Sequence, residues 1–149
     1  MAAAGTTDWE SSARTRLTES GHRAGGAREA VVELLGRQSC CLSAQEISDR
    51  LHEAGKDVGI ASIYRALELL QELGLVQRVE FGEGGARFEP VVPGGDHHHH
   101  AVCEKCGRVT PFEDERLERQ LERLAGRLRH SMRGHDLVIH GECRRCARS

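Results

Sequence analysis

The sequence contains few aromatic residues and no long apolar run. Among its 149 residues are three Phe, one Trp and one Tyr. No apolar run approaches the ~20 residues of a membrane-spanning helix, and the N-terminal MAAAGTTDWE lacks the basic start and apolar stretch of a secretion signal. We therefore expect a cytoplasmic protein with no membrane partner. Because few aromatic side chains are available for a core, small domains in this chain need another source of stability, such as bound metal or oligomerisation.

Cysteine and histidine are the residues that could supply this stability. The chain has six Cys and nine His, and four of the Cys and seven of the His follow residue 90. In a reducing compartment, paired cysteines more often bind metal or carry out redox chemistry than form disulfides. The net charge is −4 in residues 1–90 and +2 in residues 91–149. With the segment PVVPGG between them, these differences predict a domain at 1–89, a hinge at 90–96 and a second domain at 97–149.

The first half has the pattern of a winged helix-turn-helix. Apolar residues at helical spacing predict helices at 27–35, 43–55 and 60–73, and Ser43 and Glu46 predict a capping box at the start of the second. Two alternating segments on either side of a glycine-rich turn, LVQRVEF and ARFEPV, predict a hairpin. Helices joined by short connections and followed by a hairpin are typical of a winged helix that binds DNA. The alternative is a small helical domain that uses the same helices only for packing.

DNA contacts are expected from the helix at 60–73, as the recognition helix, and from the hairpin, as the wing. A half with a net charge of −4 lacks the basic surface that drives strong non-specific binding, so a few placed residues of a dimer must supply specificity. We expect the recognition helix to reach base edges and the wing to meet phosphates. The residues assigned to bases are Ala61, Ser62, Tyr64 and Arg65, and those assigned to phosphates are Arg78 and Arg87.

The second half contains two CxxC pairs. Cys103 and Cys106 form the first pair, and Cys143 and Cys146 form the second. A CxxC turn lets two thiolates converge on one ion, so two such turns predict a closed, tetrahedral zinc site of the structural kind. The alternative, two separate dithiol redox pairs, lacks the thioredoxin-like βαβ context that such pairs usually have. The zinc would tie the start of the second domain to its end.

The segment between the two CxxC pairs is predicted to fold as a strand at 109–112, a helix at 114–130 and a strand at 136–141. One face of the helix carries leucines that we expect to pack on the domain's own sheet. These are Leu117, Leu121, Leu124 and Leu128. A sheet this small leaves an exposed edge, which pairing of two copies would cover, so we expect a twofold homodimer. The predicted fold class is α+β, with an N-terminal winged helix-turn-helix domain and a small C-terminal α/β dimerisation domain that holds structural zinc.

Four consecutive histidines precede the first CxxC pair. Alternate side chains of an extended strand face opposite sides, so His97 and His99 would lie on one side and His98 and His100 on the other. Each pair could therefore begin a separate metal site. The alternative is an exposed histidine tract with loose affinity for metal.

These segments together resemble the ferric uptake regulator (Fur) superfamily from about Leu17 to Cys146. The matching stretches are LSAQEISDRL, GIASIYRALELLQELGLV, ARFE, HHHHAVCEKCGRV and the final CRRC. The resemblance implies a dimeric, metal-dependent transcription regulator, usually a repressor of metal-uptake genes, that binds a double-stranded DNA operator. It also implies that Tyr64 and Arg65 belong to the recognition helix and that the CxxC cysteines bind structural zinc.

The resemblance further implies two metal sites beyond the structural zinc. The regulatory site at the hinge would use Cys41, Glu89, His98 and His100. Asp96 is the alternative to Glu89, and Pro111 occupies the position where the family usually has a further Glu ligand. The other site, in the dimerisation domain, would use His97, His99, Glu118 and His135. Cys40 has no assigned role, and we expect it to be a small buried apolar residue.

Cys41 stands where iron-responsive members of the superfamily usually have His. One thiolate, one carboxylate and two imidazoles fit tetrahedral Zn²⁺ better than octahedral Fe²⁺. We therefore expect a protein similar to the zinc uptake regulators (Zur), with Zn²⁺ in preference to Fe²⁺ at the regulatory site. Metal bound there would join the two domains across the hinge and lock the dimer into its DNA-binding conformation.

Two other functions would use some of the same residues. The main alternative is an iron-dependent repressor that senses peroxide or redox state, through oxidation of a His ligand or of Cys40 and Cys41. A zinc hydrolase keeps an open coordination position beside a general base, whereas each ligand set in this chain can be closed by protein residues. The sequence also has no nucleophile motif or phosphate-binding loop. We therefore do not expect an enzyme.

Overall fold

The computed structural model describes residues 4–23, 25–38, 40–82, 85–91 and 97–148. Most of the hinge predicted at 90–96, together with the alternative ligand Asp96, lies outside the described residues. The chain divides into two compact units, Met1–Gly95 (unit 1) and Asp96–Ser149 (unit 2). Within the described ranges, no helix is both long enough and apolar enough to cross a membrane.

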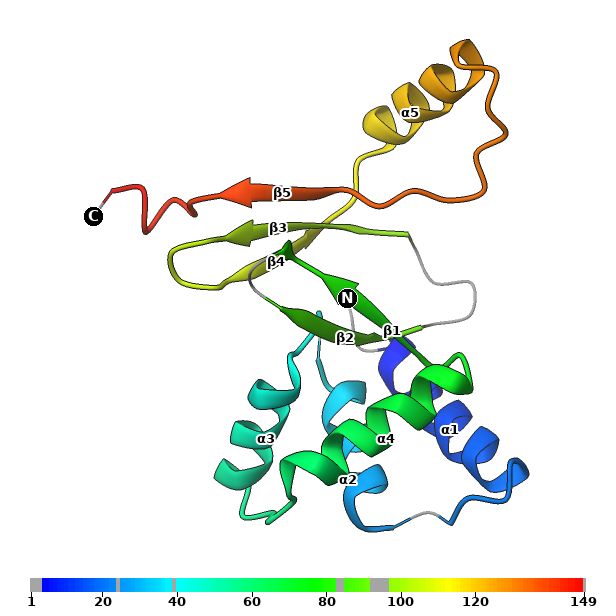
Figure 1. The fold of residues 1–149 in the computed structure, drawn as a ribbon, viewed down its shortest axis with the longest axis vertical. Coiled ribbons are helices and arrows are strands. Elements are labelled where there is room, and N and C mark those ends of the chain that lie inside the picture. The colour runs from blue at the N-terminus through cyan, green and yellow to red at the C-terminus, as the bar shows by residue number, and fades with distance from the viewer. Residues whose placement is uncertain (1–3, 24, 39, 83–84, 92–96, 149) are drawn as a thin grey trace. The chain divides into compact units, whose positions relative to one another are not determined.

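Unit 1 consists of helices that pack against a two-stranded hairpin (Figure 1). Its elements are α1 (Ala4–Glu19), α2 (Gly26–Gly36), α3 (Ala44–Glu53), α4 (Ile60–Glu72), β1 (Val76–Glu80) and β2 (Ala86–Pro90). The strands β1 and β2 pair antiparallel, with Val76 opposite Pro90. The helices α2, α3 and α4 and the hairpin all lie within two residues of their predicted bounds. They form the winged helix-turn-helix that the sequence predicts.

Local signals in the sequence set the ends of α3 and α4. The Oγ atom of Ser43 accepts a hydrogen bond from the N–H of Glu46 at 3.1 Å, which is the N-cap half of the predicted capping box. At the C-terminal end of α4, the N–H of Leu75 donates a hydrogen bond to the carbonyl of Leu70, and Gly74 has a φ of +70°. Glycine adopts this left-handed conformation without a steric penalty, so the helix stops there and the hairpin begins.

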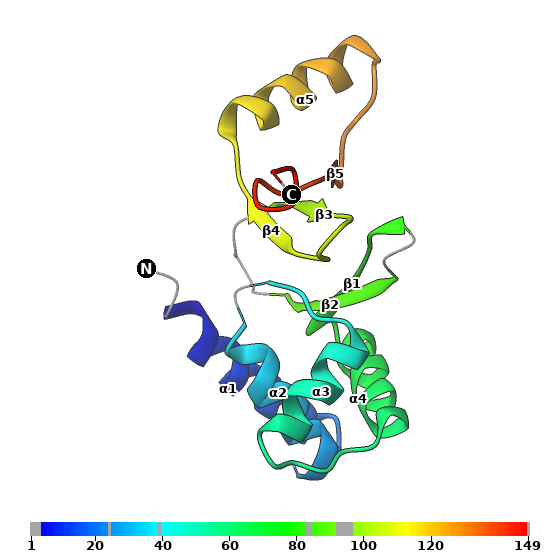
Figure 2. The ribbon, with the colours of Figure 1, turned by 90° about the vertical axis from the view of Figure 1, so that its left-hand side faces the viewer.

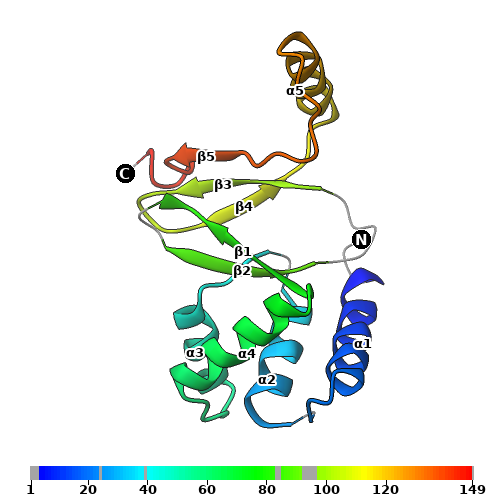
Figure 3. The same ribbon diagram turned by 45° about the vertical axis from the view of Figure 1, so that its right-hand side comes forward.

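The helix α1 was not expected from the sequence. It buries Trp9, Ala13 and Leu17, which repeat every four residues along one face. The Nε1 atom of Trp9 donates a hydrogen bond to the carbonyl of Leu75 at 2.9 Å, which ties α1 to the end of α4. Figure 3 shows α1 alongside α2, with which it packs. The apolar stripe is only one residue wide in an otherwise polar segment, and so narrow a stripe gives a weak periodic signal.

Unit 2 contains a three-stranded sheet and one described helix. Its elements are β3 (His99–Cys103), β4 (Val109–Phe112), α5 (Glu115–Arg127) and β5 (Val138–Gly141). The strand order is β4-β3-β5, with β4 antiparallel and β5 parallel to β3. Within residues 97–148, only His99, His100 and Cys103 are buried. The hydrophobic core cluster of the described chain is made entirely of unit 1 residues, so residues 97–148 form no apolar core of their own.

The leucine face of α5 does not pack on the sheet of unit 2, so that prediction is wrong. Leu124 and Leu128 are 41% and 66% exposed, and no residue of α5 is buried. Figure 2 shows α5 running away from the three strands. The contact that ties the helix to the sheet is polar, because Glu118 in its first turn reaches His99 of β3. The helix extends from this point and leaves Leu124 and Leu128, the C-terminal half of its leucine stripe, exposed.

The packing of α1 gives a testable prediction. Leu17 is 1% exposed, so Leu17→Ala would leave a cavity in the core of unit 1. We expect this change to lower the free energy of unfolding by about 2–5 kcal/mol. Denaturant titration followed by the fluorescence of Trp9, the single Trp, measures the effect. Thr15→Ala, at an exposed position of the same helix, should change the free energy by at most about 0.5 kcal/mol. Equal effects of the two substitutions would contradict the packing of α1.

Candidate metal centres

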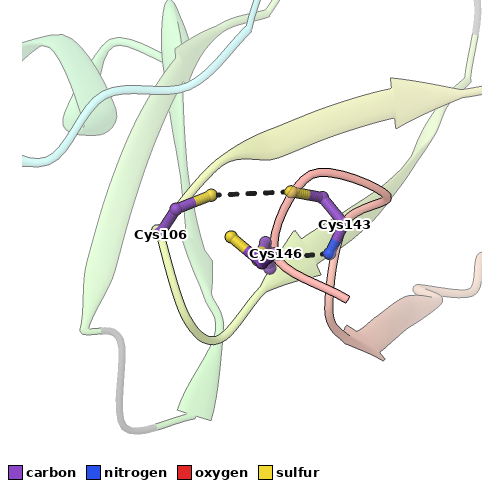
Figure 4. Close-up of side chains that lie close together, drawn as sticks. Cys106, Cys143 and Cys146 are labelled. Atoms are coloured by element: carbon purple, nitrogen blue, oxygen red, sulfur yellow. Dashed lines mark hydrogen bonds between the residues drawn. The ribbon is translucent and has the colours of Figure 1, made fainter. Parts of the chain in front are cut away.

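The four CxxC cysteines converge at one end of the sheet of unit 2. β3 ends at Cys103, and Gly141 of the parallel strand β5 stands in register opposite it, so both CxxC turns leave the same end of the sheet (Figure 4). The four sulfur atoms all lie within 4.8 Å of one another, and the Sγ atoms of Cys106 and Cys143 are 3.8 Å apart. A Zn–S bond of about 2.3 Å and a tetrahedral angle also place two thiolates about 3.8 Å apart. The spacing of the sulfurs therefore suits zinc.

Backbone N–H groups stabilise negative charge on two of these sulfurs. The N–H of Cys143 donates to the Sγ of Cys103 at 3.2 Å and, with the N–H groups of Cys106 and Lys105, lowers the pKa of Cys103 to about 6. The N–H of Cys146 lowers the pKa of Cys143. The hydrogen bond with Cys143 raises the pKa of Cys146 to about 12, since clustered thiols resist losing all their protons together. A bound divalent cation would offset this repulsion, so both charge and geometry fit structural zinc.

A second cluster lies where α5 and the segment before β5 meet β3. One ligand atom from each of His97, His99, Glu118 and His135 lies within 4.8 Å of the others. The Nε2 atom of His99 is 2.5 Å from Oε1 of Glu118, and this hydrogen bond is the main cause of a lowered pKa for Glu118. The Nε2 atom of His135 is 2.8 Å from Oε2 of the same carboxylate but lacks hydrogen-bond geometry. The buried Nδ1 of His99 has no hydrogen-bond partner in the described part of the chain. Imidazoles held around a carboxylate in this way fit a divalent cation.

The unit 2 half of the predicted regulatory set follows from the alternation of side chains along β3. The ring centroids of His98 and His100 are 4.8 Å apart, and those of His97 and His99 are 4.6 Å apart. The histidines thus pair by alternate positions, as expected for a strand. Pro111 of β4 stands opposite His100 in register. Because the proline side chain carries no ligand atom, Pro111 cannot supply a further ligand to the regulatory set of His98 and His100.

The unit 1 half of the predicted regulatory set is held by a backbone bridge. Leu42 and Phe88 form an isolated antiparallel bridge, and the residues next to them, Cys41 and Glu89, lie side by side. Cys41 is 4% exposed and Glu89 is 2% exposed. The side-chain amide of Gln77 on β1 donates a hydrogen bond to the Glu89 carboxylate. The bridge and this hydrogen bond fix a thiol and a carboxylate next to each other.

Cys40 belongs to this group, and sequence reasoning missed it. It is half-buried, where a buried apolar residue was expected, and its Sγ lies 3.5 Å from the Sγ of Cys41. The two sulfurs and a carboxylate oxygen of Glu89 all lie within 4.8 Å of one another. The hydrogen bond with Cys40, burial and the negative charge of Glu89 raise the pKa of Cys41. The adjacent cysteines are the one signal in the sequence that could have assigned Cys40 here.

The base-contact residues predicted for DNA lie at the N-terminal end of α4. Tyr64 is 51% exposed, and Ala61 and Arg65 are also exposed. Arg65 donates a hydrogen bond to the hydroxyl of Ser62 at 3.1 Å. On the hairpin, Arg78 is exposed, and it lines with Tyr64 a groove of about 600 Å³ between α4 and the hairpin. These residues are therefore accessible to a partner.

Arg87, which is predicted to meet a phosphate, pairs with a carboxylate of unit 1 in this structure. Its side chain is only 15% exposed, and its guanidinium lies 2.6 Å from the carboxylate of Glu46 in the first turn of α3. The hairpin register places Arg87 opposite Val79 and Arg78 opposite Phe88, so the two arginines face opposite sides of the hairpin. Arg87 therefore joins the hairpin to α3 and does not extend from it.

Comparison with known proteins identifies a family for this chain. The model of the ferric uptake regulator family matches residues 19–140. A ferric uptake regulation protein of Bacillus subtilis (strain 168) is 36% identical over 135 residues, which cover 89% of this chain and 91% of that protein.

Solved structures of ferric uptake regulators share the fold. The regulator of Helicobacter pylori matches with a TM-score of 0.83 and 26% identity, covering 97% of this chain and 95% of that one, and is described as having three functional metal-binding sites. The regulator of Vibrio cholerae matches with a TM-score of 0.78 and 30% identity, covering 87% of this chain and 98% of that one. These matches confirm the predicted α+β class. The chain thus belongs to the ferric uptake regulator family, whose members are metal-dependent, DNA-binding transcription regulators and not enzymes.

Proposed function

We propose that this chain is a zinc-dependent repressor of metal-uptake genes that binds a double-stranded DNA operator as a cytoplasmic homodimer. The observation that carries the proposal is the division of one ligand set between two units. Cys41 and Glu89 lie side by side in unit 1, whereas His98, just before β3, and His100, on β3, have adjacent rings in unit 2. An ion held by all four residues requires the units to come together across residues 90–96. Four ligands divided in this way are suited to couple metal binding to the position of the winged helix-turn-helix domain.

The donor atoms favour zinc over iron at this regulatory site. A thiolate and two imidazoles are softer ligands than oxygen donors, and soft ligands favour zinc. Together with the Glu89 carboxylate they make four ligands, which complete a tetrahedral zinc site. Ferrous iron is served better by five or six ligands, but Pro111 opposite His100 offers none. We therefore place the protein with the zinc uptake regulators of the family.

The hinge gives these ligands their regulatory effect. Metal bound at the regulatory site supplies a cross-link between the two units of one chain. Without the metal, this cross-link would not fix the separation of the two winged helices in a dimer. Winged helices that bind one face of DNA must lie ~34–36 Å apart, which is one helical turn. Cross-linking and DNA binding select the same arrangement, so each favours the other, with a coupling free energy typically of ~1–3 kcal/mol.

The other two ligand sets are proposed to stabilise unit 2. Zinc at Cys103, Cys106, Cys143 and Cys146 would join the ends of β3 and β5, and metal at His97, His99, Glu118 and His135 would fasten α5 to β3. Because unit 2 has no apolar core within residues 97–148, these ties supply the stability that apolar burial supplies in unit 1.

The homodimer is proposed to form through surfaces that unit 2 leaves uncovered. The exposed leucines of α5 are one such surface. The outer edge of β5, where Ile139 is 52% exposed, has no partner strand in the described residues. Twofold pairing of two chains would cover these surfaces and present two recognition helices to a palindromic operator.

The regulatory site gives the first prediction of this proposal. With zinc kept at the four-cysteine site, added zinc should raise the affinity of the full-length protein for operator DNA by about 5–150-fold. Cys41→Ser should remove most of this response, because it removes the buried thiolate. Fluorescence anisotropy with an operator selected from a random duplex library measures the affinity. Operator binding that is equal with and without added zinc would contradict the proposal.

The same experiment separates the proposal from the peroxide sensor. The two sulfurs of Cys40 and Cys41, 3.5 Å apart, are the feature that favours this second candidate. A response to ferrous iron that exceeds the zinc response and is lost after mild peroxide, with oxygen added to a His or Cys, would favour it. Ligands left unoxidised under those conditions favour the zinc regulator.

The four-cysteine site gives the second prediction. Cys103→Ser should unfold unit 2 or dissociate the dimer, because zinc binding at structural sites contributes roughly 10–16 kcal/mol to folding in small zinc domains. Elemental analysis should show one fewer zinc per chain, and sedimentation should show the loss of the dimer. Arg144→Ala, an exposed position inside the second CxxC turn, should retain both zinc and dimer. A folded, dimeric Cys103→Ser protein would refute the structural role.

The recognition helix gives the third prediction. Arg65→Ala should weaken operator binding by about 1–3 kcal/mol in the zinc-loaded protein, whereas Arg78→Ala should reduce the salt dependence of binding by about one unit of slope. Arg37→Ala is the matched control and should bind as the parent does, since the Arg37 side chain, at the C-cap of α2, is 69% exposed. Unchanged binding by Arg65→Ala would contradict the assignment of α4 as the recognition helix.

A further inference from the structure

We infer that Cys40 supplies a second thiolate to the metal held by Cys41 and Glu89, so that unit 1 alone offers two sulfurs and one oxygen to a divalent cation. The inference rests on the proposed function, because it concerns the same regulatory site. It adds a ligand that the resemblance to the family does not assign, and it changes the charge and softness of the site.

The distances in unit 1 fit this assignment. The Sγ atoms of Cys40 and Cys41 are 3.5 Å apart, close to the ~3.8 Å between two thiolates on one tetrahedral zinc. The separation resembles the 3.8 Å between Cys106 and Cys143 in the four-cysteine cluster. It is far longer than the ~2.05 Å of a disulfide bond. A carboxylate oxygen of Glu89 lies within 4.8 Å of both sulfurs, so three donor atoms surround one position.

The surroundings of the three residues hold them in this arrangement. All three lie in unit 1, and the bridge between Leu42 and Phe88 fixes the two backbone segments that carry them. The hydrogen bond from Gln77 orients the Glu89 carboxylate, as residues around metal ligands commonly do. Cys41 and Glu89 are buried, whereas Cys40 is half-buried.

A second thiolate has a chemical consequence for metal choice. Thiolates select zinc and other soft or borderline ions over Mn²⁺ and Fe²⁺, which prefer oxygen and nitrogen donors. With three donors from unit 1, one imidazole of His98 or His100 is enough to complete a tetrahedral zinc site. The adjacent cysteines therefore make the regulatory site a zinc-selective one.

Titration with Co²⁺ tests the inference on the full-length, reduced protein with zinc kept at the four-cysteine site. Co²⁺ bound to thiolate absorbs in the near ultraviolet with an intensity that grows with the number of sulfurs. The cluster of His97, His99, Glu118 and His135 contains no sulfur and so cannot contribute to this absorption. We expect Cys40→Ser to lose about half of the band, since one of two soft donors is removed. The double variant Cys40→Ser/Cys41→Ser should lose all of it, and Gln38→Ala, beside the cysteines, should keep it.

Retention of the full band by Cys40→Ser would overturn the inference. X-ray absorption at the cobalt edge of the unaltered protein gives a measurement that needs no substitution. Two sulfur neighbours per regulatory Co²⁺ are expected, and one would overturn the inference. Operator binding in the same samples separates this result from the proposed function. Two sulfur neighbours with no change in operator affinity on metal binding would support Cys40 as a ligand but refute the metal-dependent repressor. One sulfur neighbour with increased operator affinity would refute Cys40 as a ligand but support the metal-dependent repressor.

Discussion

The described part of unit 2, residues 97–148, lacks an apolar core, and the rest of the structure depends on this constraint. Its buried residues between 97 and 148 are two histidines and a cysteine, all candidate metal ligands. The core cluster is built from α1 to α4 and the hairpin of unit 1, and it includes Trp9 and Phe88. The scarcity of aromatic residues therefore has different consequences for the two units. Unit 1 is stabilised by aliphatic packing around these two rings, whereas unit 2 needs ligand atoms that a metal can draw together.

The register of β3 distributes those ligand atoms. The strand and the two residues before it contribute to all three ligand sets, through the alternating histidines and through Cys103 at the strand's end. Pairing with β4 on one side and β5 on the other fixes this register. A shift of one residue would exchange the two faces, because the side-chain period of a strand is two. One short strand therefore determines which histidines are available to stabilise unit 2 and which can bind the regulatory metal.

Sequence reasoning succeeded where the physical cause is local. The CxxC turns and the Ser43 cap act over three residues, so their spacing alone predicts what they do. It failed where the outcome depends on distant partners. The helix α5 leaves Leu124 and Leu128 exposed because the sheet of unit 2 does not pack against them. The pairing of Arg87 with Glu46 of α3 likewise depends on the hairpin face that Arg87 occupies, which its local sequence does not indicate. Cys40 is a candidate metal ligand only because it lies close to Glu89, a residue distant in sequence that the backbone bridge between Leu42 and Phe88 brings near.

Native mass spectrometry of the zinc-saturated, full-length protein tests most directly the central claim that three ligand sets of one chain each bind a metal ion. We predict a dimer that carries three zinc ions per chain at saturation. After treatment with a chelator, we predict that the zinc held by the four cysteines remains and that the others are lost. A saturated protein with a single zinc per chain, or a folded dimer that loses every zinc to the chelator, would contradict the claim.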